Sequence, residues 1–127
     1  MYLTFIKYSY IIFRGVNWEA IPRTIEMYKT AEGKRLFPDW LDSQTREVQA
    51  FVDIRLKKVQ RGLLGDHHAE GSGVWALIFD DGPGTRVYFG LTDSQKVVLL
   101  LVGGNKKRQN QDIQQEIGFW EDFKKNN

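Results

Sequence analysis

Residues 71–89, GSGVWALIFDDGPGTRVYF, determine the fold that the rest of the chain must complete. Two runs rich in β-branched and aromatic residues, 74–80 and 85–91, flank the turn residues of 81–84, DGPG, which tolerate the unusual backbone angles of a tight turn. The segment therefore predicts two antiparallel strands joined by a turn.

The second strand of this hairpin alternates between polar and apolar residues. Period-two alternation places Arg86 and Tyr88 on one face, and Val87 and Phe89 on the other. We expect the polar pair to face away from the core, on a sheet surface that the helices leave open. An arginine and a tyrosine on such a surface suit a phosphate or an RNA backbone. A purely structural role remains the alternative: Arg86 would pair with an aspartate of the turn, and Tyr88 would cap the sheet.

The regions outside the hairpin complete an α+β domain. In chain order we expect a strand at 23–29, a short helix at 37–41, a longer helix at 43–61, a buried strand at 96–102 (KVVLLLV) and a closing helix with Ile113, Ile117 and Trp120 on one face. A loop with His67 and His68 precedes the hairpin. The order β-α-α-β-β-β-α predicts a small single domain whose mainly antiparallel sheet carries its helices on one face.

Composition excludes several functional classes. The 127 residues, 42% of them hydrophobic, suit one domain with a real core. The absence of cysteine excludes disulfide scaffolds, thiolate zinc sites and cysteine nucleophiles. The net charge of +2 is too small for a whole-molecule electrostatic attraction to nucleic acid, so only local clusters could bind it.

Residues 1–22 form an extension to the expected domain of residues 23–127. The apolar run 1–13, MYLTFIKYSYIIF, is shorter than the roughly 20 residues that span a bilayer, and Lys7 lies inside it. We therefore expect neither a membrane span nor a signal peptide. Four interpretations stay open: an extra strand, an arm for a partner chain, a membrane-surface contact, or upstream sequence translated from a misassigned start codon.

Two basic clusters are candidates for anion binding. The polar side of the longer helix carries Arg55, Lys57, Lys58 and Arg61, and residues 106–108, KKR, follow the double glycine after the buried strand. Each cluster is either a solvated surface or a contact for phosphate or an acidic partner. We expect no metal site, because the adjacent His67–His68 pair has no third histidine or cysteine to complete it.

From residue 24 to residue 123 the sequence resembles the RelE/ParE toxin superfamily, specifically the HigB-like addiction-module killer proteins. Three matching segments are 28–43 (YKTAEGKRLFPDWLDS), 71–89 and 98–113 (VLLLVGGNKKRQNQDI), and spaced Arg55, Leu56 and Gly62 fall between the first two. The resemblance implies a RelE-like fold.

The family's properties imply a toxin of a type II toxin–antitoxin module. Such a toxin is cytoplasmic and forms a hetero-oligomer with a cognate helix-turn-helix antitoxin. It inhibits translation by cutting mRNA, usually on the ribosome. The reaction needs no metal or other cofactor, and no membrane is expected as a partner. In that chemistry the 2′-hydroxyl attacks the adjacent phosphate while cations stabilise the developing charge and acid–base groups move protons.

The resemblance also indicates which residues would act. Arg86 and Tyr88 match the family's GPGYRVYF-like hairpin, and Lys106 matches the lysine of its GGDKSTQ-like segment. His68 lies where a lysine is common. The candidate catalytic residues are therefore Arg86, Lys106, Tyr88 and His68, and the candidate RNA-binding residues are Arg55, Lys57, Arg61, Lys107 and Arg108.

The sequence departs from the family in the hairpin. Ile78 stands where an outward-facing arginine is usual, and Asp80 and Asp81 place negative charge where RNA would approach. Two alternatives to the ribonuclease therefore remain. One is a ParE-like inhibitor of DNA gyrase, and the other is a catalytically degenerate protein that only binds antitoxin.

Overall fold

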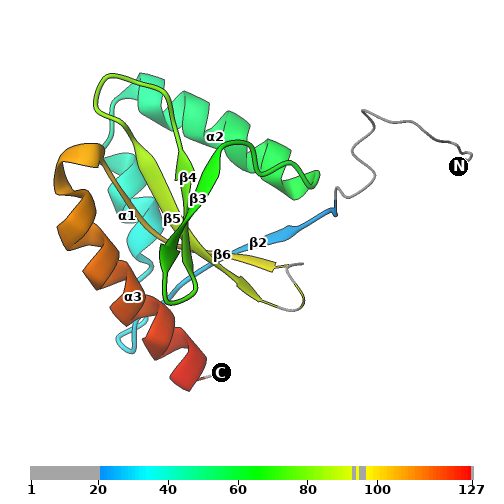
Figure 1. Ribbon diagram of the computed structural model, residues 1–127, viewed down its shortest axis with the longest axis vertical. Coiled ribbons are helices and arrows are strands. Elements are labelled where there is room, and N and C mark those ends of the chain that lie inside the picture. Colours follow the sequence, from blue (N-terminus) through cyan, green and yellow to red (C-terminus); the bar gives the residue numbers. More distant parts are fainter. Residues whose placement is uncertain (1–20, 93, 95–96, 127) are drawn as a thin grey trace, which may run out of the picture.

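The computed structural model describes residues 21–92, 94 and 97–126. The predictions for residues 1–20 lie outside this part of the chain. The elements in chain order are β2 (Thr24–Met27), α1 (Leu36–Asp42), α2 (Arg46–Gln60), β3 (His67–Gly71), β4 (Val74–Ile78), β5 (Arg86–Thr92), β6 (Val97–Gly104), the short 3-10 helix η1 (Lys106–Arg108) and α3 (Gln109–Lys125) (Figure 1).

The strands form one mixed sheet in the order β2-β6-β5-β4-β3. Strand β2 runs parallel to β6, and the other neighbours are antiparallel. The predicted hairpin is confirmed as β4 and β5, with Ile78 opposite Arg86 and Trp75 opposite Phe89. The α+β class is therefore confirmed.

The predicted element order lacked one strand. Residues His67–Gly71 form β3, which pairs with β4 at one edge of the sheet, so the expected loop was wrong. The sequence HHAEG carries no apolar alternation, because an edge strand can leave one face and one backbone edge in water. Ser72, at φ 54°, and Gly73, at φ 87°, supply the left-handed turn that joins β3 to β4.

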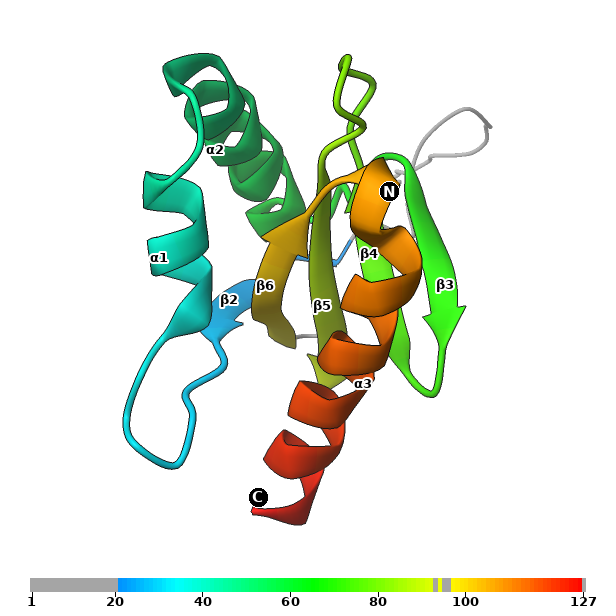
Figure 2. The ribbon, with the colours of Figure 1, turned by 90° about the vertical axis from the view of Figure 1, so that its left-hand side faces the viewer.

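The helices cover both faces of the sheet, which corrects the prediction that they share one face. Helices α1 and α2 pack on one side, and α3 packs on the other (Figure 2). The first core contains Phe37, Val52 and Phe89. The second contains Tyr88 and Trp120. The apolar stripe of α3 needs an apolar surface of its own, and the sequence VWALI gives β4 one on each side.

Two glycines let the helices approach the sheet closely. A Cβ atom on Gly90 would lie 2.2 Å from the ring of Trp120 on α3, and a Cβ on Gly103 would lie 2.3 Å from the ring of Trp40 on α1. Each indole therefore lies against bare backbone. This contact fixes the distance of its helix from the sheet.

Helix α2 is fixed by a cap at its first turn and by Arg55 within its second half. The Thr45 hydroxyl caps the first turn by accepting a hydrogen bond from Val48 N at 3.2 Å. Further along, the Arg55 guanidinium donates to the carbonyls of Ile78 (2.8 Å) and Asp66 (3.3 Å). Arg55 thereby ties α2 to the ends of β4 and β3.

No helix within the described residues is long and apolar enough to cross a membrane.

Candidate functional site

The start of β5 and the end of β6 bring Arg86 to one end of the sheet. Arg86 lies opposite Ile78 on one neighbouring strand and Gly104 on the other. It is only 8% exposed. Its Nη1 donates to the Gly84 carbonyl at 3.1 Å, whereas its buried Nε has no hydrogen-bond partner among the described residues. A buried guanidinium with an unused donor favours an anionic ligand.

Lys106 lies next to Arg86 across the β4–β5 turn. A Cβ atom on Gly84 would lie 2.9 Å from Lys106 Cβ and 3.7 Å from Arg86 Nη1. The backbone N–H of Lys106 also donates to the Pro83 carbonyl at 3.3 Å. The turn therefore holds the two expected cations on either side of Gly84, although 19 residues of sequence separate them.

Helix η1 extends this positive surface. Asn105 begins it, and its side-chain oxygen accepts a hydrogen bond from Arg108 N at 3.3 Å. Lys107 and Arg108 are exposed beside Lys106. Residues 106–111 line a cavity of about 320 Å³ at the N-terminal end of α3. The positive end of the α3 dipole and the lysine side chains beside it attract anions.

Tyr88 is in the core, not on an open face as expected. It is 0% exposed because α3 covers it. Its hydroxyl oxygen has no hydrogen-bond partner among the described residues. Burial raises the pKa of Tyr88, and the nearby Asp112 carboxylate adds to the shift, so the hydroxyl stays protonated. Tyr88 therefore presents no ring for a base to stack on in this arrangement.

An acidic cluster that was not predicted from the sequence surrounds Tyr88. Asp112 and Glu116 reach it from α3, and Glu70 from β3. Burial raises the pKa of Glu116 to about 8, the charge of Asp112 adds to this, and the backbone amide of Val102 opposes it. Glu116 is 0% exposed, and within the described part of the chain neither of its carboxyl oxygens has a hydrogen-bond partner of good geometry.

A sequence signal for this cluster existed. Asp112, Glu116 and Trp120 follow one another at intervals of four, so the two acids share the buried stripe of α3 with the tryptophan. Burial also raises the pKa of Asp112, against the effect of Arg108, whose Nε lies 3.8 Å from its carboxylate.

His68 lies at the edge of the sheet, apart from the two cations. It is exposed on β3, in register with Ala76 on β4, which in turn lies opposite Tyr88. Its Nε2 lies 3.3 Å from Asp66 Oδ1. One strand therefore separates His68 from Tyr88.

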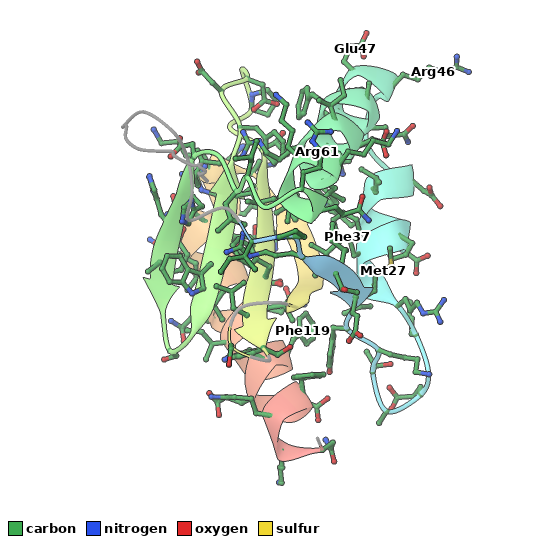
Figure 3. All side chains as sticks on the ribbon, turned by 90° about the vertical axis from the view of Figure 1, so that its right-hand side faces the viewer. Met27, Phe37, Arg46, Glu47, Arg61 and Phe119 are labelled. Atoms are coloured by element: carbon green, nitrogen blue, oxygen red, sulfur yellow. The ribbon has the colours of Figure 1, made fainter. Side chains whose placement is uncertain are left out.

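The candidate cations of α2 belong to the other layer. Arg55 is occupied by two backbone carbonyls and lies 4.4 Å from the centre of the Phe79 ring. Lys57 forms an exposed ion pair with Asp53 at 3.0 Å. Arg61 ends the helix, at the opposite end from Arg46 and Glu47 (Figure 3). The structure therefore does not join these residues to Arg86 and Lys106.

The departures seen in the hairpin have local explanations. Ile78 is half-buried and packs with the α3 core, so its position beside Arg86 is apolar. Asp81 accepts hydrogen bonds from the backbone N–H and the hydroxyl of Thr85, both at 2.7 Å. Its carboxylate thus shapes the turn that carries Arg86.

Within the described ranges, no three acidic, histidine or cysteine side chains are grouped so that they could hold a metal ion.

Comparison with known proteins identifies one relative. Over 80 residues, 62% of this chain, the sequence is 35% identical to an uncharacterized protein from Haemophilus influenzae, and the match covers 80% of that protein. The two chains belong to one family. Neither a family model nor a solved structure matches this chain.

Proposed function

We propose that this protein is the toxin of a type II toxin–antitoxin module and a metal-free endoribonuclease that cleaves mRNA on the ribosome. The observation that carries the proposal is the pairing of Arg86 and Lys106 across Gly84. Two cations around one point, next to the N-terminal end of a helix, suit a phosphate that gains negative charge. The resemblance of the hairpin and of the 98–113 segment to the killer proteins supplies the substrate.

In this account the substrate provides its own nucleophile. The ribose 2′-hydroxyl attacks the neighbouring phosphorus while water takes up its proton. The bond to the 5′-oxygen breaks, this oxygen gains a proton from water, and a 2′,3′-cyclic phosphate remains. Lys106 and the buried Arg86 stabilise the charge on the phosphoryl oxygens. Lys107 and Arg108 hold the flanking backbone phosphates. Tyr88 and Glu116 lie beneath α3 and position the sheet without touching RNA.

The proposed setting is the bacterial cytoplasm, where mRNA and ribosomes meet. A cognate helix-turn-helix antitoxin would neutralise the protein in a toxin–antitoxin hetero-oligomer. The second candidate is a degenerate protein that binds antitoxin without cleaving RNA. The burial of Tyr88, which keeps the predicted stacking ring away from the surface, favours this alternative.

The test is growth and protein synthesis after the full chain is induced in a bacterium that lacks the antitoxin. We expect arrest with the parent chain, and loss of arrest with Lys106→Ala, which removes an exposed cation without disturbing the core. Lys125→Ala, at the far end of α3, is the matched control and should still arrest growth. Arrest that persists in soluble Lys106→Ala would contradict the assigned site, and no arrest with soluble parent protein would favour the degenerate alternative.

A further inference from the structure

Gly104, the last residue of β6, has a carboxylate in the place where other residues carry a side chain. A Cβ atom built on Gly104 would collide with Oδ2 of Asp112, which lies in the first turn of α3. The same point is 3.6 Å from Cε2 of Tyr88, on the sheet face that α3 covers (Figure 2). Asp112 therefore fills the place of the missing side chain, and only glycine leaves room for it.

This place lies directly opposite Arg86. Arg86 and Gly104 are partners in the antiparallel pairing of β5 with β6, so their Cβ positions share one face of the sheet, about 5 Å apart. The Arg86 guanidinium extends from there to the Gly84 carbonyl. Lys106 follows Gly104 by two residues and lies against the same Gly84. Asp112 therefore lies beside the two cations that are proposed to bind the phosphate.

The Asp112 carboxylate is largely enclosed, yet water can still reach it. Its side chain is 11% exposed, and its Oδ1 lies 3.8 Å from Nε of the exposed Arg108. Burial raises the pKa of Asp112, whereas the charge of Arg108 lowers it. A raised pKa makes this carboxylate a stronger base than an aspartate in open solvent. Asp112 thus combines basicity with access for water.

Three other acids near Arg86 or Tyr88 lack this combination. Both carboxylate oxygens of Asp81 accept hydrogen bonds from Thr85. Glu116 is 0% exposed, so bulk water does not reach it. Glu70 lies on β3, which β4 separates from β5. Asp112 is therefore the best placed of these acids to exchange a proton with water at the phosphate site.

We propose that Asp112 is the base of the cleavage reaction and receives the proton of the ribose 2′-hydroxyl through one water molecule. The inference rests on the proposed function and adds the acceptor that the proton needs. A base that acts through a single water is still close enough to assist the attack. Asp112 acts on this water and does not touch the RNA.

The protons balance over one turnover. The water takes the proton of the 2′-hydroxyl and passes one of its own to Asp112, which becomes a neutral carboxyl group. The 2′-oxygen bonds to phosphorus, the bond to the 5′-oxygen breaks, and the 5′-oxygen takes a proton from a second water. The hydroxide that this second water leaves behind removes the proton from Asp112, and the carboxylate is restored.

The test measures single-turnover cleavage by the full chain on purified ribosomes that carry a defined mRNA. We expect Asp112→Asn to slow cleavage about a hundredfold, because the amide keeps the shape and cannot take the proton. The Kd for ribosomes whose mRNA has a 2′-deoxy nucleotide at the cleaved position should stay within about threefold of the parent value. Glu121→Gln removes the same charge from an exposed position on α3 and should leave both values unchanged.

A second variant separates chemistry from structure. Asp112→Ala leaves a space above Gly104 that a small carboxylate can enter. Sodium formate should therefore raise the cleavage rate of this variant about tenfold over sodium chloride at the same ionic strength. Formate should not change the rate of Glu121→Gln. Circular dichroism of each variant shows whether it is folded.

Three outcomes would overturn the role of Asp112 and leave the ribonuclease intact: cleavage by folded Asp112→Asn at the parent rate, an equal loss of cleavage and binding, or no activation of Asp112→Ala by formate. A parent chain that leaves the mRNA intact would instead refute the proposed function, and Asp112 would then have no reaction to assist. The parent chain and the variants thus report on the two proposals separately.

Discussion

Glu116 is a carboxyl group enclosed between α3 and the sheet, and its protonation should affect stability. Burial raises its pKa to about 8 in the folded protein, above the 4.5 of an exposed glutamate. Between these two values the folded state binds more protons than the unfolded state. Stability contributed by the neutral carboxyl is therefore present below about pH 4.5 and is lost as the pH rises through about 8.

We predict that Glu116→Gln removes this pH dependence. The amide has nearly the same shape and no charge, so the variant should exceed the parent in stability at pH 9 by on the order of 2 kcal/mol. At pH 5 the two proteins should be similar. Urea unfolding at pH 5, 7 and 9 measures the difference, and parallel curves for parent and variant would refute the assignment of the buried acid.

Tyr88 provides a second prediction at the residue scale. Its hydroxyl oxygen is buried without a hydrogen-bond partner among the described residues, so the hydroxyl contributes little to stability. Tyr88→Phe should leave the free energy of unfolding unchanged or raise it by up to about 1 kcal/mol. The inducer concentration that Tyr88→Phe needs for growth arrest should stay within about twofold of the parent value. Loss of arrest in a stable Tyr88→Phe protein would show that the hydroxyl takes part in the chemistry.

The residues differ in how far the sequence could identify them. Arg86 was first indicated by strand alternation and Lys106 by its place in the basic cluster 106–108, and the resemblance gave both their catalytic role. The turn between them explains why they meet. Alternation correctly assigned Arg86 and Tyr88 to one face of β5. It could not show that α3 covers that face, because the alternation of one strand says nothing about which helix packs on it.

At the scale of elements, local patterns determined most of the secondary structure. The hairpin was predictable because turn residues separate two apolar runs, and α2 because its apolar residues recur at helical spacing. Strand β3 was not predictable in this way, since HHAEG gains its strand conformation from pairing with β4. Which helix covers which face of the sheet depends on contacts between distant segments, and local patterns do not contain them.

The close contacts between helices and sheet give a prediction about glycine. Gly103→Ala would place a methyl group inside the Trp40 ring, so we expect a loss of about 1–3 kcal/mol in stability. Gly118→Ala is the matched control, because Gly118 lies within α3 with no atom within 4 Å of the added methyl. This variant should gain about 0.5–1 kcal/mol from helix propensity. Equal effects of the two changes would contradict the packing described.

At the scale of the whole molecule, positive charge is divided between two separate surfaces. One surface is formed by Lys106, Lys107 and Arg108 on η1. The other lies on α2, across the sheet. Since the chain carries a net charge of only +2, RNA binding depends on where these charges are placed.

We predict that only the η1 surface binds RNA. The double variant Lys107→Ala/Arg108→Ala should weaken binding of a single-stranded RNA. The slope of log K against log salt concentration should become about 1.4 less steep, because two phosphate contacts are lost. Lys57→Ala/Arg61→Ala removes the same charge from α2 and should change neither value. Titration of a labelled RNA at several salt concentrations distinguishes them, and equal losses would show that both surfaces contact RNA.

The most direct test of the Arg86–Lys106 site is primer extension on host transcripts after the full chain is induced, beside the Lys106→Ala variant. We expect new 5′ ends within translated regions that appear with the parent chain and disappear with the variant at equal protein level. Arrest of growth with intact transcripts, or identical cleavage by a folded Lys106→Ala protein, would contradict it.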